Sequence, residues 1–443
     1  MRGGFKVYDA DTHVMPVAEV LGQYVDPGFR PRLQELAAYQ VPAGGTAEGA
    51  EARHRYSVHQ RFYRRVLGEA GPHSTFTGRG GAWRGALRPR PGVQDDQAPN
   101  RVKDMDEEGA DVHFLVPSSW TGVVGLDDTT LEVGLIRAYH RHMADFCGQF
   151  PDRLKGMIVV STAHVDESVH EIQHWGTAKW AVAVMLLVRK PIDHPDLEPI
   201  WQAAQDHDLA VVHHSSTWNP PYFPGSQDIW DNIFLGRMAS HPWGAMRFVA
   251  AFVGAGIMDR YPNLRVGILE SGFGWLPFWA KRMDEQAGYV GGTAPLKHKP
   301  SDYLTSGRFF SSIEMHEGED MFNCVTSLLG HDVLMYASDL SALRVPLPQL
   351  YRLRPRLVEP EGGDTAKAAL GQRDAVLQTD VRRRRLLGPG DGIEGALRRD
   401  NVHRVAYHDR APADLTRCPE LPQHLSCMGL QAKDDPGFGA DQH

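Results

Sequence analysis

Short apolar runs alternate along residues 101–339 with longer segments in which apolar residues recur every three to four positions. Continuous apolar runs are typical of buried strands, and the wider spacing is typical of amphipathic helices. The pattern predicts strands at residues 5–8, 112–116, 154–160, 180–188, 209–212, 264–269, 309–313 and 333–337. It predicts helices at residues 131–150, 167–175, 197–207, 234–261, 276–287 and 321–329.

Eight strands separated mostly by helices indicate an α/β fold. Strands that alternate with helices lie parallel, and eight such units favour a closed (β/α)₈ barrel, or TIM barrel, over an open sheet. The strands are almost continuously apolar, which fits burial on both faces. We therefore expect one TIM barrel over residues 1–339.

Two regions depart from this alternation. Residues 20–100 are rich in Gly, Pro and Arg and follow the first strand, so we interpret them as an insertion that caps the pocket on the active-site face. Residues 340–443 lose the strand and helix periodicity and form an irregular tail.

Composition excludes several classes of protein. The chain has 443 residues and a net charge of −8, which gives no overall attraction to nucleic acid or an anionic membrane. No apolar stretch approaches the roughly 20 residues of a membrane span, and the N-terminus lacks a signal-peptide pattern, so we expect a cytoplasmic protein. The arginine run at 382–385 lacks a recognition motif and stacking aromatics, so we predict no nucleic-acid binding.

Metal-capable side chains follow four of the predicted strands. Asp11 and His13 are two apart, so on an extended strand both point to the same side. His214 and Asp339 each end a later apolar run, and register favours His214 over His213. Because active sites of such barrels lie at the C-terminal strand ends, these positions predict a metal site.

Two further residues are candidates for catalysis. Glu270 ends the run at 264–269 and opens a glycine-containing turn, although a helix-capping carboxylate would fit the same pattern. Asp339 is suited both to bind a metal and to accept a proton as a general base.

Several motifs together resemble the amidohydrolase-2 family, which includes aminocarboxymuconate semialdehyde decarboxylase and the resorcylate decarboxylases. In chain order they are DADTHV at 9–14, RVKDMDEEGAD at 101–111, SHP at 240–242, RYPNLR at 260–265, LESGFGWLP at 269–277 and ASD at 337–339. The resemblance implies a distorted (β/α)₈ barrel and favours a homodimer. It also implies one divalent metal ion, with zinc expected first and manganese second, bound by Asp11, His13, His214 and Asp339.

The resemblance also bears on the reaction. It implies a metal-dependent carboxy-lyase acting on a small aromatic or unsaturated carboxylate, with Asp339, Glu270 or His241 as the acid. Where the decarboxylases have a histidine, this chain has Glu270. Two alternatives therefore stay open. One is a hydrolase that uses metal-activated water on an ester, lactone or amide, and the other is a catalytically impaired barrel that acts as a binding protein.

The tail breaks the family pattern directly after Asp339. The family continues with Tyr-Pro-His and Phe-Pro, whereas residues 340–350 read LSALRVPLPQL. One permitted coding of these residues, read one base later, encodes YPHSECRFPN, so we hypothesise a frameshift at this point. An unambiguous in-frame read of the gene through codons 335–355 would refute it.

Overall fold

The computed structural model describes residues 6–42, 53–56, 97–117, 126, 128–214 and 232–339. All of them belong to the compact unit Met1–Val381. The irregular tail at 340–443 and most of the insertion lie outside the described residues. The hypothesised frameshift and the capping role of the insertion therefore stay predictions.

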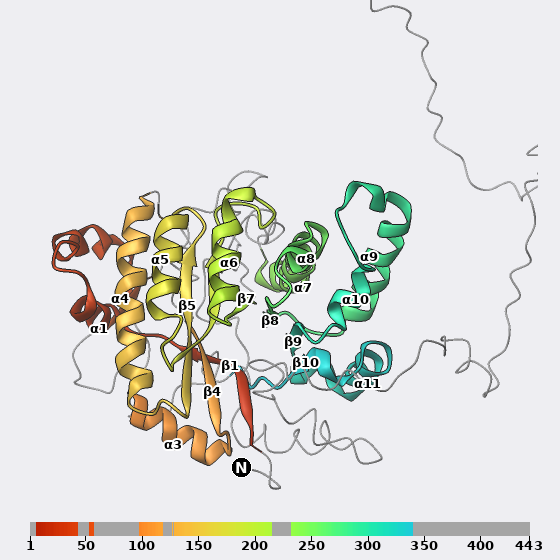
Figure 1. Cartoon of the computed structure of the whole chain (residues 1–443). Helices are drawn as coiled ribbons and strands as arrows, with labels where there is room; N and C mark the ends of the chain where they lie inside the picture. Colours follow the sequence, from red (N-terminus) through yellow and green to blue (C-terminus); the bar gives the residue numbers. More distant parts are fainter. Residues whose placement is uncertain are drawn as a thin grey trace, which may run out of the picture. The chain divides into compact units, whose positions relative to one another are not determined.

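Eight parallel strands form the barrel that the sequence predicted (Figure 1). In order they are β1 (Tyr8–Val14), β4 (Val112–Pro117), β5 (Leu154–Ser161), β6 (Ala181–Leu187), β7 (Ala210–His214), β8 (Val266–Leu269), β9 (Phe309–Ser312) and β10 (Leu334–Met335). Backbone hydrogen bonds join the last strand region to the first: Ala10 N donates to Tyr336 O at 2.9 Å, and Asp339 N donates to Asp11 O at 3.0 Å. The fold is therefore a TIM barrel.

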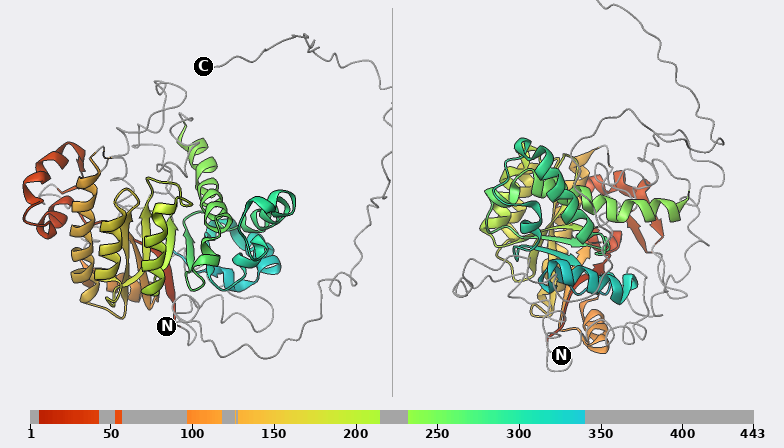
Figure 2. Two further views of the ribbon diagram at one scale, coloured as in Figure 1. Left: turned by 45° about the horizontal axis from the view of Figure 1, so that its top comes forward. Right: turned by 90° about the vertical axis from the view of Figure 1, so that its right-hand side faces the viewer.

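Helices surround the barrel, most of them at the predicted places. They are α3 (Ala98–Glu108), α4 (Thr129–Gly148), α5 (Val165–Trp175), α6 (Glu198–Asp206), α7 (Ile233–Gly254), α8 (Ile257–Arg260), α9 (Leu276–Val290), α10 (Pro300–Leu304) and α11 (Gly318–Leu329). Figure 2 shows α4, α5 and α6 side by side along one flank. The helical region expected at 234–261 is confirmed, and it consists of two helices because Gly256 adopts φ +69° and separates α7 from α8. Helices α3 and α10 were not predicted.

The first strand is longer than its apolar run. The apolar run lies at 5–8, and β1 continues through the polar motif to Val14 because pairing with β4 continues to Pro117. Asp11 and His13 therefore lie on an extended strand, as expected. Asp9 pairs with His113 in register, whereas Thr12 pairs with Leu115, so β1 carries one extra residue in this interval. This β-bulge at Ala10 and Asp11 changes which side chains face the barrel interior.

Two apolar cores result from strands buried on both faces. The inner core fills the barrel and includes Ala10, Val112, Phe114, Met157, Met185, Val212, Phe310 and Met335. The outer core lies between strands and helices and includes Leu115, Ile158, Trp201, Phe248, Phe252 and Phe273. In a regular strand Ala10 and Val14 would point to the same face, but Ala10 belongs to the inner core and Val14 to the outer one. The bulge therefore reverses which positions of β1 face the barrel interior.

The described part of the insertion packs along α4. It contains α1 (Ala18–Tyr24), the 3₁₀ helix η1 (Arg30–Tyr39) and a small antiparallel sheet of β2 (Gln40–Pro42) and β3 (His54–Tyr56). Arg141 donates to Tyr24 O at 2.6 Å, and Arg32 pairs with Asp128 at 2.6 Å. The start of the insertion is thus attached to the second helix of the barrel.

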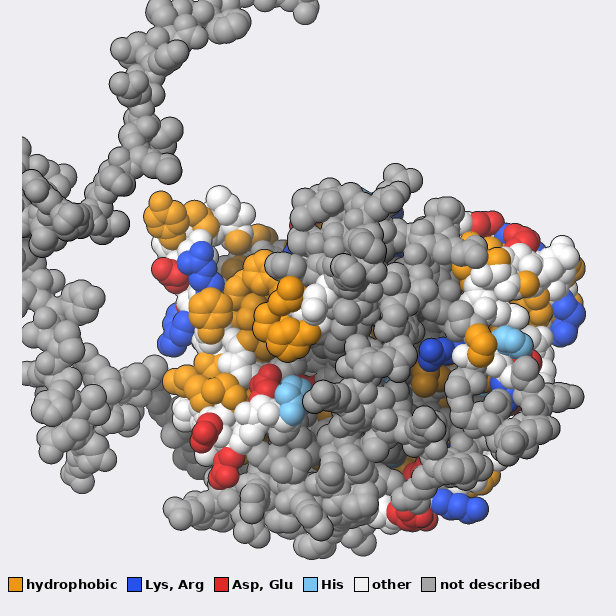
Figure 3. All heavy atoms as spheres, turned by 180° about the vertical axis from the view of Figure 1, so that it is seen from behind, with side chains coloured by type: hydrophobic (Ala, Val, Ile, Leu, Met, Phe, Trp, Pro, Cys, Tyr) orange, Lys and Arg blue, Asp and Glu red, His pale blue; other side chains and the backbone are white. Residues whose placement is uncertain are grey.

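Large apolar side chains remain exposed on α7 and α9, including Phe234, Met238, Trp243, Phe278 and Tyr289. Figure 3 shows hydrophobic side chains gathered on the face opposite the view of Figure 1. The exposure of these side chains does not test the expected homodimer, which stays a prediction. None of the helices in the described ranges has the length and apolar character needed to cross a membrane.

Candidate metal centre

Five side chains from the C-terminal ends of four strands meet in one buried cluster. They are Asp11 and His13 from β1, His214 from β7, Glu270 after β8 and Asp339 after β10. His13 Nε2 lies 2.9 Å from Asp339 Oδ1 and 3.6 Å from Asp11 Oδ1. His214 Nε2 lies 3.2 Å from Glu270 Oε2 and 3.7 Å from Asp11 Oδ1. The structure thus brings together all four residues expected as metal ligands, and Glu270 joins them.

The backbone at two of these residues adopts an uncommon conformation. Glu270 has φ +47° and Asp339 has φ +55°. Left-handed backbone at a non-glycine residue costs free energy and is concentrated at functional sites. In both cases the residue with this backbone conformation carries a carboxylate that lies in the cluster.

Buried polar groups behind the cluster hold its backbone. Asp9 Oδ1 accepts the N–H of Ser338 at 2.9 Å, and the Arg101 guanidinium donates to His13 O. Asp9 itself belongs to a separate buried group with Glu108 and His113. The bulge in β1 accounts for its separation from Asp11.

Negative charge accumulates around Asp11. Burial raises the pKa of its carboxyl group well above the usual value, and the nearby carboxylates of Asp339, Glu270, Glu314 and Asp9 raise it further. Among the described residues, neither side-chain oxygen of Asp11 accepts a hydrogen bond. A cation bound here would supply the missing positive charge and a partner for these oxygens.

The spacing of the ligand atoms suits a small divalent cation. Ligand atoms that bind one ion at about 2.1 Å lie roughly 3.0 Å apart in octahedral geometry and 3.4 Å apart in tetrahedral geometry. The four separations between imidazole nitrogens and carboxylate oxygens, 2.9, 3.6, 3.2 and 3.7 Å, cover this range. The residues present therefore fit the metal that the sequence led us to expect.

The two adjacent histidines on β7 have different surroundings. The ring of His214 faces the cluster and meets the His13 ring edge-on, with centroids 5.0 Å apart. His213 faces α7 and stacks on Phe248 at 4.6 Å. Burial lowers the pKa of His213 to about 3, so its ring is neutral at pH 7. The register argument thus selected the histidine that lies in the cluster.

Glu314 is a site residue that sequence reasoning missed. It is buried, follows β9 by two positions, and its carboxylate raises the pKa of Asp11. The sequence contained the signal that would have identified it, because Glu314 directly follows the predicted strand at 309–313, just as Glu270 follows the run at 264–269.

His241 lies in α7, but its side chain is outside the described residues, so its catalytic role stays a prediction. Lys190, which follows β6, pairs with Asp196 and is not one of the cluster residues.

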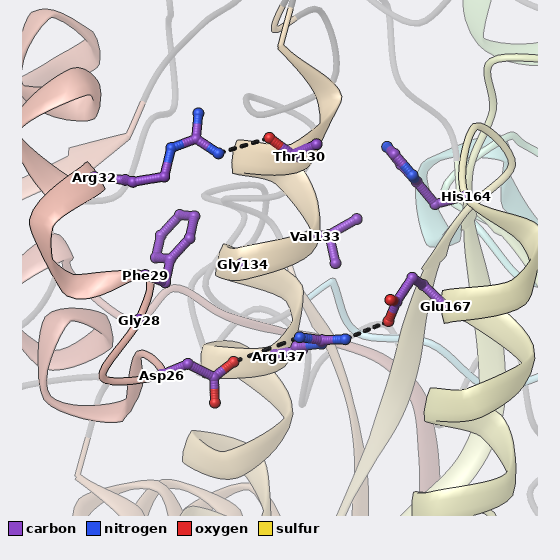
Figure 4. A pocket seen from close by; sticks show the side chains of 10 residues that line it. All are labelled: Asp26, Gly28, Phe29, Arg32, Thr130, Val133, Gly134, Arg137, His164 and Glu167. Carbon is purple, nitrogen blue, oxygen red and sulfur yellow. Dashed lines mark hydrogen bonds and ion pairs between the residues drawn. The ribbon is translucent and has the colours of Figure 1, made fainter.

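A cavity of about 410 Å³ lies elsewhere, between the insertion and helices α4 and α5 (Figure 4). Three charged side chains that line it pair with one another. Arg137 binds Glu167 through Nη2, and Arg137 Nη1 lies 3.7 Å from Asp26 Oδ2. None of the cluster residues lines it. The candidate active site is therefore the buried cluster, where ligand-type residues converge, and not this cavity. The segments 118–125 and 215–231, which follow β4 and β7, lie outside the described residues.

Comparisons with known proteins agree with the fold. Solved structures of similar fold include an amidohydrolase from Mycobacterium avium subsp. paratuberculosis (TM-score 0.61, 15% identity, covering 84% of this chain and 98% of that chain). Another is 5-carboxyvanillate decarboxylase from Novosphingobium aromaticivorans, complexed with manganese and 4-hydroxy-3-methoxy-5-nitrobenzoic acid (TM-score 0.57, 19% identity, 85% and 97% coverage). A third is 2,6-dihydroxybenzoate decarboxylase from Rhizobium (TM-score 0.53, 15% identity, 84% and 98% coverage).

At the level of sequence, no curated protein matches the chain significantly. The profile of the Amidohydrolase family (Amidohydro_2), however, matches residues 8–348. This match includes every residue of the metal-ligand cluster and confirms the resemblance found in the motifs. The chain therefore belongs to the amidohydrolase family of enzymes.

Proposed function

We propose that the chain is a metal-dependent decarboxylase of a small aromatic or unsaturated carboxylate, with one divalent cation bound by Asp11, His13, His214 and Asp339. The observation that carries this proposal is the buried convergence of these four side chains at the C-terminal ends of the strands. Family membership supports it, as do the similar folds of two aromatic-carboxylate decarboxylases.

The ligand set favours a cation that accepts oxygen ligands. With Glu270 included, the cluster offers three carboxylates and two imidazoles. Such a set suits manganese at least as well as zinc, because carboxylate-rich sites favour harder metals. When bound, the cation would act as a Lewis acid toward oxygen atoms of the substrate.

The carboxylates of the cluster are suited to proton transfer. In decarboxylation the bond to the carboxylate carbon breaks, its electron pair remains on the other carbon, and that carbon takes a proton as carbon dioxide leaves. Glu270 and Asp339 are the acids we propose for this step, because both lie beside a cluster histidine in a region where carboxylates crowd one another. His241 is a third candidate.

A hydrolase is the second candidate function. It is favoured by Glu270, which stands where the resembling decarboxylases have a histidine. Glu270 or Asp339 would then accept a proton from the attacking water. The two reactions use the same ligands, so they differ in the bond that breaks and not in the site.

The deciding experiment uses the purified full chain loaded with Mn²⁺ or Zn²⁺ in deuterium oxide. Decarboxylation of a hydroxybenzoate panel releases carbon dioxide and places one deuterium on the carbon that lost it, as mass spectrometry would show. Turnover of esters, lactones or amides without carbon dioxide release would support the hydrolase instead. A well-folded sample that binds no metal would contradict both and support the binding-protein alternative.

A further inference from the structure

The turn after β8 is held by a carboxylate from the neighbouring strand's loop. Glu317, at the end of the 3₁₀ turn η5 (Met315–Glu317), accepts two backbone N–H groups through Oε2. The donors are Phe273 at 3.1 Å and Gly274 at 2.6 Å. Both belong to the segment that joins Glu270 to α9, so Glu317 ties this segment to the loop after β9.

The turn leaves room for this carboxylate because it contains a glycine. Gly272 has φ +69°, and a Cβ atom placed on it would lie 2.2 Å from Glu317 Oε1. A side chain at position 272 would therefore collide with the carboxylate and strain the backbone as well. The absence of a side chain at Gly272 therefore leaves the space that the Glu317 carboxylate occupies.

Glu270 lies directly before this arrangement and has φ +47°. Its own N–H donates to Ser312 Oγ at 3.1 Å, so the turn is bound to the β9 region at two points. An uncommon backbone conformation persists only where its surroundings enforce it. These two ties surround the residue whose carboxylate lies 3.2 Å from His214 Nε2.

We propose that Glu317 is a positioning residue of the metal centre. Its carboxylate fixes the turn at 270–274 and so keeps the Glu270 carboxylate in the cluster, where it serves as a fifth ligand beside the four named above. The inference rests on the proposed function, because it assigns Glu317 a part in holding the cation's ligand set. Glu317 touches neither the cation nor the substrate in this role and acts through Glu270. Residues that orient ligands in this way affect metal affinity by about 10- to 100-fold.

A double-mutant cycle tests the proposal. We expect Glu317→Ala to weaken Mn²⁺ binding about tenfold or more, measured by electron paramagnetic resonance titration, and to change the spectrum of the bound ion. In a Glu270→Ala background the same substitution should have little further effect, because the residue through which it acts is gone. Glu317→Gln keeps an oxygen acceptor for both N–H groups and should restore most of the affinity. Gly272→Ala should reproduce the effect of Glu317→Ala.

Glu319→Ala is the matched control, since it removes an exposed glutamate two positions away on α11 and should leave Mn²⁺ affinity unchanged. Equal affinity in wild type and Glu317→Ala would overturn the inference while leaving the proposed function intact. Equal losses with and without Glu270 would also overturn it, because they would indicate a general structural role. A wild-type chain that binds neither Mn²⁺ nor Zn²⁺ would overturn the proposed function and this inference together.

Discussion

His13 Nε2 lies 2.9 Å from Asp339 Oδ1, although the two residues are 326 positions apart in the chain. The first belongs to the first strand of the barrel and the second follows the last strand, so their contact lies at the point where the barrel closes. Backbone bonds between β1 and the segment after β10 hold the two chain ends together there. Closure of the barrel therefore brings these two cluster residues together.

The two histidines of β7 offer a matched pair of variants. We expect His214→Ala to abolish tight binding of Mn²⁺ or Zn²⁺, because it removes an imidazole from the cluster. His213→Ala should retain the metal and lose stability, by about 2–3 kcal/mol, since it removes a buried ring that stacks on Phe248. Elemental analysis after dialysis and urea unfolding measure the two effects. Metal loss in His213→Ala alone would contradict the assignment of ligands.

Asp11 should destabilise the metal-free protein at neutral pH. Its pKa is raised in the folded state by burial and by neighbouring carboxylates, so the folded chain holds this proton more tightly than the unfolded chain. The stability that this tighter proton binding contributes is fully present below the pKa of Asp11 in the unfolded chain, about 3.9. It is lost as pH rises through the pKa of Asp11 in the folded chain. We expect metal-free Asp11→Asn to melt at a higher temperature than metal-free wild type at pH 7.5.

The same comparison near pH 4 supplies the control, because the wild-type carboxyl group is then protonated and the difference in melting temperature should shrink. Added Mn²⁺ should raise the melting temperature of wild type and leave that of Asp11→Asn unchanged. An Asp11→Asn variant that is less stable than wild type at pH 7.5 without metal would show that charge repulsion in the cluster is small.

His213 should make the fold sensitive to acid. Its pKa is lowered to about 3 by burial, whereas an unfolded histidine has a pKa of about 6.5. Below pH 6.5 the unfolded chain takes up a proton that the folded chain does not, so stability falls as pH decreases from about 6.5 to about 3, by at most roughly 5 kcal/mol. The free energy of unfolding of His213→Leu should vary less across this window. Identical pH profiles for the two proteins would contradict the prediction.

Gly134 allows the insertion to pack on α4. A Cβ atom at this position would lie 2.1 Å from the nearest atom of the Phe29 ring, which Figure 4 shows beside the helix. We expect Gly134→Ala to destabilise the fold by about 1–3 kcal/mol in urea unfolding without changing metal affinity. Gly148→Ala, at the other end of α4 with no atom within 4 Å of its Cβ, is the control and should be neutral or slightly stabilising.

Local pattern was sufficient to predict most of the framework. Strands buried on both faces produce apolar runs, so all eight strands could be predicted. Metal-binding side chains at the ends of these runs identified Asp11, His214 and Asp339 as candidates. The break between α7 and α8 was missed because the helical pattern continues across Gly256. Glu314 was overlooked although the rule that selected Glu270 applies to it equally.

The sequence by itself determined that ligand-type residues would gather at one end of a barrel, because parallel strands align their C-terminal ends. Only the tertiary structure decided which face of β1 carries them. Simple alternation puts Asp9 and Asp11 on one side, yet the extra residue at Ala10 and Asp11 separates the two and sends only Asp11 into the cluster. A bulge depends on how β1 pairs with β4, a contact between segments about a hundred residues apart, so no local pattern in β1 could show it.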